Sequence, residues 1–474
     1  MADSLSELAG SVRTGGCSAS ELIEESINRI EAVNPTLNFL AATAYDQALA
    51  AASDPGRLGA GGPLDGLPLL VKDLEDVTGL ATRQGSLLSS SEPATATSPS
   101  VAKLVAAGAI IVGKATLPEF AIEGFTSSRL HGSTGNPWVP ALSPGGSSGG
   151  SAAALSCGAV AIATATDGGG SARIPAAFCG LLGLKPTNGL IGRWPAPDWL
   201  AFSTDGIMTT SAADLRLLAT VMAGPVSGDP TALPLPAVSR VLAQGLPKAK
   251  SLFACVRTSA LGEVSPAIST LLDEAVSAIS SLLGVEPHWL APGSLFEGTD
   301  PDLDWFILAA TEHLSAIRSR GIDPTDPSLH VASRAFFDQG AAIDVEHYLV
   351  AARNRFEHVR SVDELLGSNG ILVTPTVISE GWMADGRLTE DGEPAELPPS
   401  VYNTALANMT GHPALSIPAG ILPNGLPFGV QVIAPRYSDG WLLDLAERFE
   451  ERFPWPRHAP GFHPLSNTSN KSNE

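Results

Sequence analysis

Cysteine is scarce in this chain, and the short motifs that bind metals or nucleotides are missing. The 474 residues include 4 cysteines, none in a Cys-x-x-Cys pair, so neither a disulfide framework nor a zinc site is indicated. No HExxH segment supplies zinc ligands, and no Gly-Lys-Ser or Gly-Lys-Thr triplet follows a glycine run as in a Walker loop. We therefore expect no metal and no cofactor. A reduced, cytoplasmic protein is the simplest interpretation.

Basic side chains and long apolar runs are also few. Lysine and arginine total 28 against 49 aspartates and glutamates, which gives a formal net charge of −21. Nucleic acids and anionic membranes bind clustered basic side chains, so neither is an expected partner. No stretch is apolar over the width of a bilayer, and residues 1–15 lack the apolar core of a signal peptide. The 44% hydrophobic content favours a soluble α/β enzyme with a large core, and it leaves a homodimer open.

Glycine, alanine and serine concentrate in one stretch, residues 143–189, which contains SPGGSSGGSAAAL and ATDGGGSARIPAAF. The stretch places Ser147 and Ser171 beside glycines, and an alanine-rich helix and a short apolar strand are predicted between them. Glycine lets backbone N–H groups turn toward an anion, so the run before Ser171 can form an anion-binding nest. A helix beginning just after Ser171, with Pro175 in its first turn, would add its positive end. A nest beside a serine hydroxyl favours acyl transfer.

An apolar strand predicted over residues 67–71 ends at Lys72. A lysine in this place is either a surface residue whose stem lies along the strand end or a buried base. Burial in a glycine-lined site would disfavour the charged form and lower the pKa of the amine, so that it could accept a proton. The neighbouring Asp73 would either oppose that fall in pKa or hydrogen-bond the loop that follows.

These segments closely resemble the signature of the amidase signature family, serine hydrolases that use a Ser–Ser–Lys triad. The resemblance implies Ser171 as the nucleophile, Ser147 on a cis peptide as the bridging serine, and Lys72 as the base. Because the base must be neutral, an alkaline optimum is expected. The predicted oxyanion-hole donors are the N–H groups of Gly168, Gly169, Gly170 and Ser171.

The residues around the glycine run add two expectations. Family members commonly carry a hydroxyl or β-branched residue where this chain has Gly168, so the loop should be looser and the floor of the site wider. Asp167 and Arg173 flank the run and are predicted to pair beneath it. That pair would support the loop rather than take part in proton transfer.

The resemblance also suggests where a substrate binds. Residues 114–121 are similar to a family segment beside the substrate, which implies that Ala121, Ile122 and Phe125 line the acyl or leaving-group pocket. Shortly after the signature, Ile191 and Trp194 are further candidate pocket residues, and each of these side chains has a core role as its alternative. Other aromatic candidates for pocket walls are Trp199, Trp305, Phe306, Phe336 and Phe337.

The predicted fold is α/β, with a central mixed, largely parallel sheet covered by helices on both faces and an inserted helical region that selects the substrate. The resemblance covers residues 18–218 and 370–452, and helices are predicted between them at 263–283, 304–320 and 345–366. The expected divisions are 1–225 for the N-terminal core with the triad, 226–366 for the helical variable region, 367–460 for the C-terminal strands and helix, and 461–474 for a polar tail.

The expected activity is hydrolysis of a C–N acyl bond in a small neutral or hydrophobic amide through a covalent acyl-serine intermediate. Anilides, aryl amides and carbamates are the expected substrates, with esterase side activity. Two alternatives are a glutamine amidotransferase subunit that works with partner chains, and a non-catalytic binding protein on the same fold. No ammonia tunnel is recognisable for the first, and the intact triad disfavours the second.

A third alternative is a nucleophile elbow, since residues 145–149 satisfy GxSxG. The elbow needs a buried strand directly before its serine, but that stretch contains three prolines, and His412 is a weak candidate partner in an apolar segment. The three prolines are Pro137, Pro140 and Pro144.

Overall fold

The computed structural model describes residues 4–54, 61–200, 202–259, 264–296, 298–387 and 403–465. Most of the predicted polar tail, from residue 466 on, lies outside these ranges. The strands are β1 (Leu40–Thr43), β2 (Pro68–Lys72), β3 (Ile110–Ala115), β4 (Ser127–Ser128), β5 (Gly132–Ser133), β6 (Ile162–Asp167), β7 (Leu182–Lys185), β8 (Thr204–Thr209), β9 (Ser251–Ala254), β10 (Pro287–Trp289), β11 (Gly370–Pro375), β12 (Ala414–Ile421) and β13 (Pro427–Ile433).

Helices account for most of the remaining regular structure. They are α1 (Leu5–Thr14), α2 (Ala19–Leu37), α3 (Tyr45–Ala52), α4 (Pro99–Ala106), α5 (Gly149–Ser156), α6 (Arg173–Cys179), α7 (Ala212–Met222), α8 (Leu235–Leu242), α9 (Pro266–Leu283), α10 (Pro301–Ser319), α11 (Val331–Ala342), α12 (Val345–Leu366), α13 (Ala405–Thr410) and α14 (Asp439–Arg452), with a short 3₁₀ turn η1 (Glu119–Ala121).

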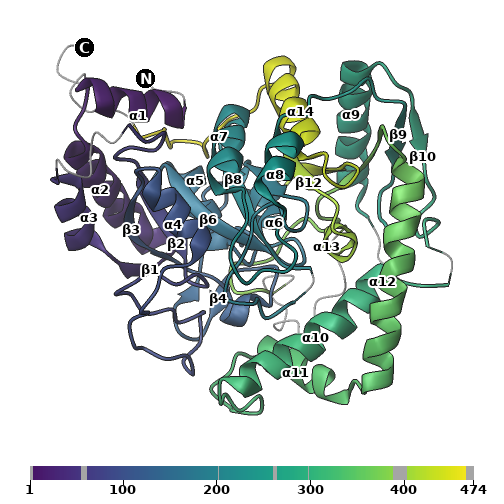
Figure 1. The fold of residues 1–474 in the computed structure, drawn as a ribbon, viewed down its shortest axis with the longest axis horizontal. Helices are drawn as coiled ribbons and strands as arrows, with labels where there is room; N and C mark the ends of the chain where they lie inside the picture. The colour runs from purple at the N-terminus through teal and green to yellow at the C-terminus, as the bar shows by residue number, and fades with distance from the viewer. Residues whose placement is uncertain are drawn as a thin grey trace.

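One 11-stranded mixed sheet crosses the described part of the chain in the order β1-β3-β2-β6-β8-β7-β12-β13-β11-β9-β10 (Figure 1). Its parallel pairs lie toward the two ends, in β3-β2-β6 and in β11-β9-β10. Every pair between β6 and β11 is antiparallel. The expectation of a largely parallel sheet is therefore wrong. The strand β8 lies between β6 and β7 and is antiparallel to both, and β12 and β13 form an antiparallel hairpin.

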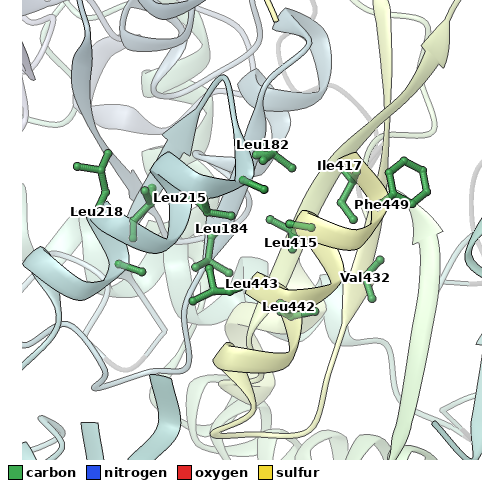
Figure 2. Packing of buried hydrophobic residues seen from close by; sticks show 14 of the residues in the cluster. Leu182, Leu184, Leu215, Leu218, Leu415, Ile417, Val432, Leu442, Leu443 and Phe449 are labelled. Atoms are coloured by element: carbon green, nitrogen blue, oxygen red, sulfur yellow. The ribbon is translucent and has the colours of Figure 1, made fainter. Parts of the chain in front are cut away.

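Helices cover both faces of the sheet, as predicted. Adjacent residues of a strand point to opposite faces, and Ile207 and Met208 of β8 accordingly belong to two different clusters of buried apolar side chains. The first cluster fills the face covered by α7, α9 and α14 (Figure 2). The second lies on the face where α5 and α6 pack, and alanine is its commonest side chain. Small side chains let these helices, which carry the signature residues, approach the strands closely.

The segment between the two parts that resemble the family is helical where predicted, at α9, α10 and α12. The helix α10 packs against both α11 and α12, and the three lie together at one side of the molecule (Figure 1). The same segment also supplies β9 and β10, which extend the sheet beyond β11 and were not predicted. The domain boundaries themselves stay a prediction. Within the described ranges, no helix combines the length and apolarity that crossing a membrane requires.

Candidate active site

Strand β2 carries Lys72 into the interior. The strand pairs with β3 on one side and β6 on the other, so it lies within the sheet rather than at an edge. The Lys72 side chain is completely buried, and its backbone N–H donates to Thr164 Oγ1 at 2.9 Å. The alternative of a surface lysine is therefore wrong.

The amine of Lys72 lies among three hydroxyl groups. Its Nζ is 2.8 Å from Ser147 Oγ, 2.9 Å from Ser148 Oγ and 2.8 Å from Thr166 Oγ1. The Gly146–Ser147 peptide is cis, as the resemblance implied. Neither Ser148 nor Thr166 was assigned a role from the sequence. The doubled serine in GGSSGG is the signal that could have found Ser148. For Thr166 the signal is its place near the end of the predicted strand before the glycine run.

The surroundings of Lys72 change its acidity. Burial, opposed mainly by the negative charges of Glu75 and Asp167, lowers the pKa of Lys72 from 10.5 to about 7. Asp73 is not among the main influences on the pKa of this amine; it pairs with Lys114 Nζ at 3.1 Å and accepts the Arg83 N–H at 3.2 Å. Of the two roles left open for Asp73, the structure supports the bond to the following loop. A large share of Lys72 is thus neutral near pH 7.

Ser171 ends the glycine run between β6 and α6. Its carbonyl accepts the Ser148 N–H at 3.2 Å, which joins the two serine segments through the backbone. Ser147 and Ser171 both line one cavity. Within the described residues, the side-chain hydrogen bonds run from Lys72 to Ser147 and do not continue to the Ser171 hydroxyl. The structure thus brings together two members of the predicted triad by direct contact and places the third beside them.

The predicted pair beneath the glycine run is present. Arg173 Nη2 lies 2.7 Å from Asp167 Oδ1, and both side chains are completely buried. Burial acts to raise the pKa of Asp167, but the charge and hydrogen bonds of Arg173 outweigh it and lower that pKa to about 2. The same carboxylate accepts the N–H of Gly170 at 2.9 Å. Gly170 therefore cannot offer this N–H to a substrate, and the predicted oxyanion hole is reduced to the other N–H groups of the run.

The expected widening at Gly168 is wrong. A Cβ at this position would lie 2.1 Å from Cε3 of Trp199, so the indole already occupies the space that a side chain would take. Trp199 in turn packs edge-on against Trp305, with ring centroids 5.5 Å apart. The indole of Trp199 thus occupies the space beside Gly168, and Trp199 forms part of the wall of the site.

A cavity of about 680 Å³ opens beside the two serines. Of the predicted substrate-binding residues, Ala121 and Trp194 line it. Phe125 and Ile191 lie in the hydrophobic core, and Ile122 packs against the aromatic cluster of Trp199. Trp199 lines the cavity, whereas Trp305, Phe306, Phe336 and Phe337 are not among its lining residues.

The cavity has an aromatic part and a polar part. Phe120, Trp199 and His313 lie on the first, and burial lowers the pKa of His313 to about 4, so the imidazole is neutral. On the second, burial and then Asp205 raise the pKa of Glu75 to about 7. The described residues contain no group of three His, Cys, Asp or Glu side chains that could hold a metal ion.

The nucleophile-elbow alternative does not fit this geometry. Residues 144–147 are not in a strand, so Ser147 lacks the strand that an elbow requires. His412 lies elsewhere, with its Nε2 3.2 Å from Asp363 and no place in the cavity lining.

A buried lysine bonded to a serine at the edge of a cavity, on an α/β sheet, is the arrangement of a hydrolase that works without histidine. The chain belongs to the Amidase family, whose model matches residues 21–443. It is an amidase, a hydrolase that acts on carbon–nitrogen bonds other than peptide bonds. The family resemblance and the α/β fold predicted from the sequence are confirmed.

Similar proteins share nearly the full length of the chain. An acylamidase of Rhodococcus erythropolis is 30% identical over 96% of this chain and 97% of its own. A glutamyl-tRNA(Gln) amidotransferase subunit of Thioalkalivibrio sulfidiphilus (strain HL-EbGR7) is 31% identical over 96% of this chain and 98% of its own. A solved bacterial aryl acylamidase of the amidase signature family has a TM-score of 0.83 and 26% identity, covering 96% of both chains.

Proposed function

We propose that this amidase hydrolyses small neutral or hydrophobic amides, such as anilides, aryl amides or carbamates, through an acyl–Ser171 intermediate. One observation carries the proposal: the buried Nζ of Lys72 lies 2.8 Å from Ser147 Oγ, at the wall of the cavity that Ser171 also lines. An amine with a pKa of about 7 can accept a proton near neutral pH.

The hydroxyls around Lys72 support a direction for the proton. Ser148 Oγ also lies 3.4 Å from the Thr166 carbonyl, to which it can donate while it accepts from Lys72. Ser147 and Thr166 are the two hydroxyls left. When Thr166 accepts the second amine hydrogen, Ser147 donates to the amine lone pair. Ser171 would pass its proton to Ser147 as its oxygen attacks the carbonyl carbon, a contact that tightens when substrate binds. The proton returns to the leaving nitrogen, and water releases the acyl group.

The lining of the cavity supports the substrate class. Phe120, Trp194 and Trp199 offer flat apolar surface to an aryl group. Both arginines in the lining are already paired, Arg193 with Asp205 at 3.0 Å and Arg320 with Asp198 at 2.6 Å. A substrate carboxylate would therefore have to compete with an existing ion pair.

A fluorophosphonate probe tests the nucleophile without a known substrate. We expect peptide mass spectrometry to find the label on Ser171, and the Ser171→Ala variant to remain unlabelled. Label on Ser147 in the wild-type protein, or none on either serine, would refute the proposed role of Ser171.

Anilide hydrolysis then tests the relay. Lys72→Ala and Ser171→Ala should each abolish turnover, and Ser147→Ala should slow it severely. Retained turnover in a folded Lys72→Ala preparation would overturn the proton route.

A glutamine-handling role is the second candidate, since the similarity to an amidotransferase subunit is as high as that to the acylamidase. Both roles can be compared directly by measuring kcat/KM for glutamine and for acetanilide. We expect acetanilide to be the better substrate. Preference for glutamine would move the assignment to the second candidate.

A further inference from the structure

Each carbonyl of the glycine run is held by a separate donor. Trp305 Nε1 donates to the Gly168 carbonyl at 2.8 Å, and Thr404 Oγ1 donates to the Gly169 carbonyl at 2.6 Å. The Gly170 carbonyl accepts the Ile174 N–H at 2.7 Å, in the first turn of α6. Three consecutive peptide units are therefore fixed in orientation.

In a trans peptide, the N–H points away from the carbonyl of the preceding residue. The Gly169–Gly170 unit shows this relation, because Thr404 holds its carbonyl while its N–H reaches Asp167 on the other side. By the same relation, the bond to Trp305 directs the N–H of Gly169 away from the indole. Among the described residues, the N–H groups of Gly169 and Ser171 have no acceptor.

The two donors reach the run because it has no side chains. A Cβ on Gly169 would lie 2.5 Å from Cζ2 of Trp305, and a Cβ on Gly170 would lie 2.3 Å from Thr404 Oγ1. Trp305 belongs to α10, and Thr404 directly precedes α13. Neither residue lines the cavity, so neither is placed to touch a substrate.

We propose that Trp305 and Thr404 are positioning residues for the oxyanion site. They hold the two peptides that flank Gly169, so that its N–H faces the oxygen that becomes negative when Ser171 attacks. This inference rests on the proposed function. The helical region would then help to position the oxyanion site, because α10 supplies the hydrogen bond from Trp305 to the Gly168 carbonyl.

The variants Trp305→Phe and Thr404→Val remove the donors and keep similar shapes. An oxyanion-hole donor contributes roughly 100-fold or more to kcat, and we expect each variant to lose about tenfold or more in kcat for acetanilide with little change in KM. Thr404→Ser keeps the hydroxyl and should restore kcat. Trp289→Phe, on the exposed edge strand β10, is the matched control and should behave as wild type.

An aryl trifluoromethyl ketone separates positioning from a general structural effect. Serine adds to its carbonyl carbon and the carbonyl electron pair moves to oxygen, so its affinity reports the oxyanion site. We expect its inhibition constant to rise in Trp305→Phe and Thr404→Val by the same factor as kcat/KM falls. Binding of acetanilide to each variant in a Ser171→Ala background should stay constant.

The outcomes distinguish the two proposals. A wild-type enzyme that forms no tetrahedral adduct, as followed by ¹⁹F NMR, would defeat the proposed function. An adduct in the wild type with unchanged ketone affinity in folded variants would overturn the positioning role alone. A loss in Thr404→Val that Thr404→Ser does not restore would also overturn it, because the hydroxyl bond would then not be the cause.

Discussion

At the scale of single residues, the acidity of Lys72 follows from opposing influences. Burial lowers its pKa most, Glu75, Asp167 and Asp205 raise it, and Arg193 lowers it further, with a result of about 7. A protonated amine cannot accept a proton from Ser147. Activity should therefore require pH values above the pKa of Lys72.

We expect kcat/KM for an anilide to fall tenfold per pH unit below about pH 7 and to level off above about pH 8. Glu75→Gln removes a charge that raises the pKa of Lys72, so its profile should move to lower pH. Kinetics from about pH 5 to about pH 9 would test both points. A flat profile over this interval would contradict the role of Lys72 as base.

Asp167 serves the loop rather than the proton relay. Its lowered pKa means that its contribution to stability is present above the ordinary carboxyl range and is lost as the pH falls through about 2. Asp167→Asn would leave the buried Arg173 charge without its partner, and we expect the free energy of unfolding to drop by about 3–5 kcal/mol.

Denaturant unfolding would measure that loss. The control is Asp385→Asn, which removes the ion pair between Asp385 and Arg387. These side chains are 43% and 30% exposed, so the change should cost less than about 1 kcal/mol. If Asp167→Asn unfolds like the wild type but has lost proton transfer, the structural role is wrong.

At the scale of elements, α10 carries Trp305 and is itself held by close packing. A Cβ on Gly340 of α11 would lie 2.7 Å from the Ala310 carbonyl of α10. Gly340→Ala should force these helices apart and lower the free energy of unfolding by about 1–3 kcal/mol. Gly10→Ala in α1 meets only the far end of Arg13 at 3.7 Å and should stabilise the protein by about 0.5–1 kcal/mol. Equal effects of the two changes would contradict the packing argument.

Local patterns were sufficient for the elements that carry the signature. Apolar runs predicted β2 and β6, and the motif indicated Lys72, Ser147 and Ser171 as the candidate triad. The direction of the central strands was not predictable in this way, because β8 is inserted between two strands that precede it in sequence. Trp305 and Thr404 contact the glycine run across 137 and 235 residues, and such distant hydrogen bonds leave no local pattern. The filling of the Gly168 space by Trp199 was missed for the same reason.

At the scale of the whole molecule, the protein carries a formal net charge of −21. The two arginines that line its cavity are already paired with carboxylates. Such a charge repels anions over distances comparable with the Debye length, about 10 Å at 0.1 M salt. A neutral substrate does not experience this repulsion. The charge should thus favour neutral amides before any contact forms in the cavity.

A matched pair of anilides tests this selection. We expect 4-acetamidobenzoate, an anion, to have a lower kcat/KM than neutral 4-acetylacetanilide at low salt, because it must approach against the molecular field. Sodium chloride at about 0.3 M screens that field, and it should raise kcat/KM for the anion several-fold while leaving the neutral compound nearly unchanged. Comparison of both compounds at low and high salt controls for general effects of salt on the enzyme. A preference for the neutral anilide that does not change with salt would assign the discrimination to the paired arginines of the cavity. Equal kcat/KM values for the two compounds would contradict electrostatic selection altogether.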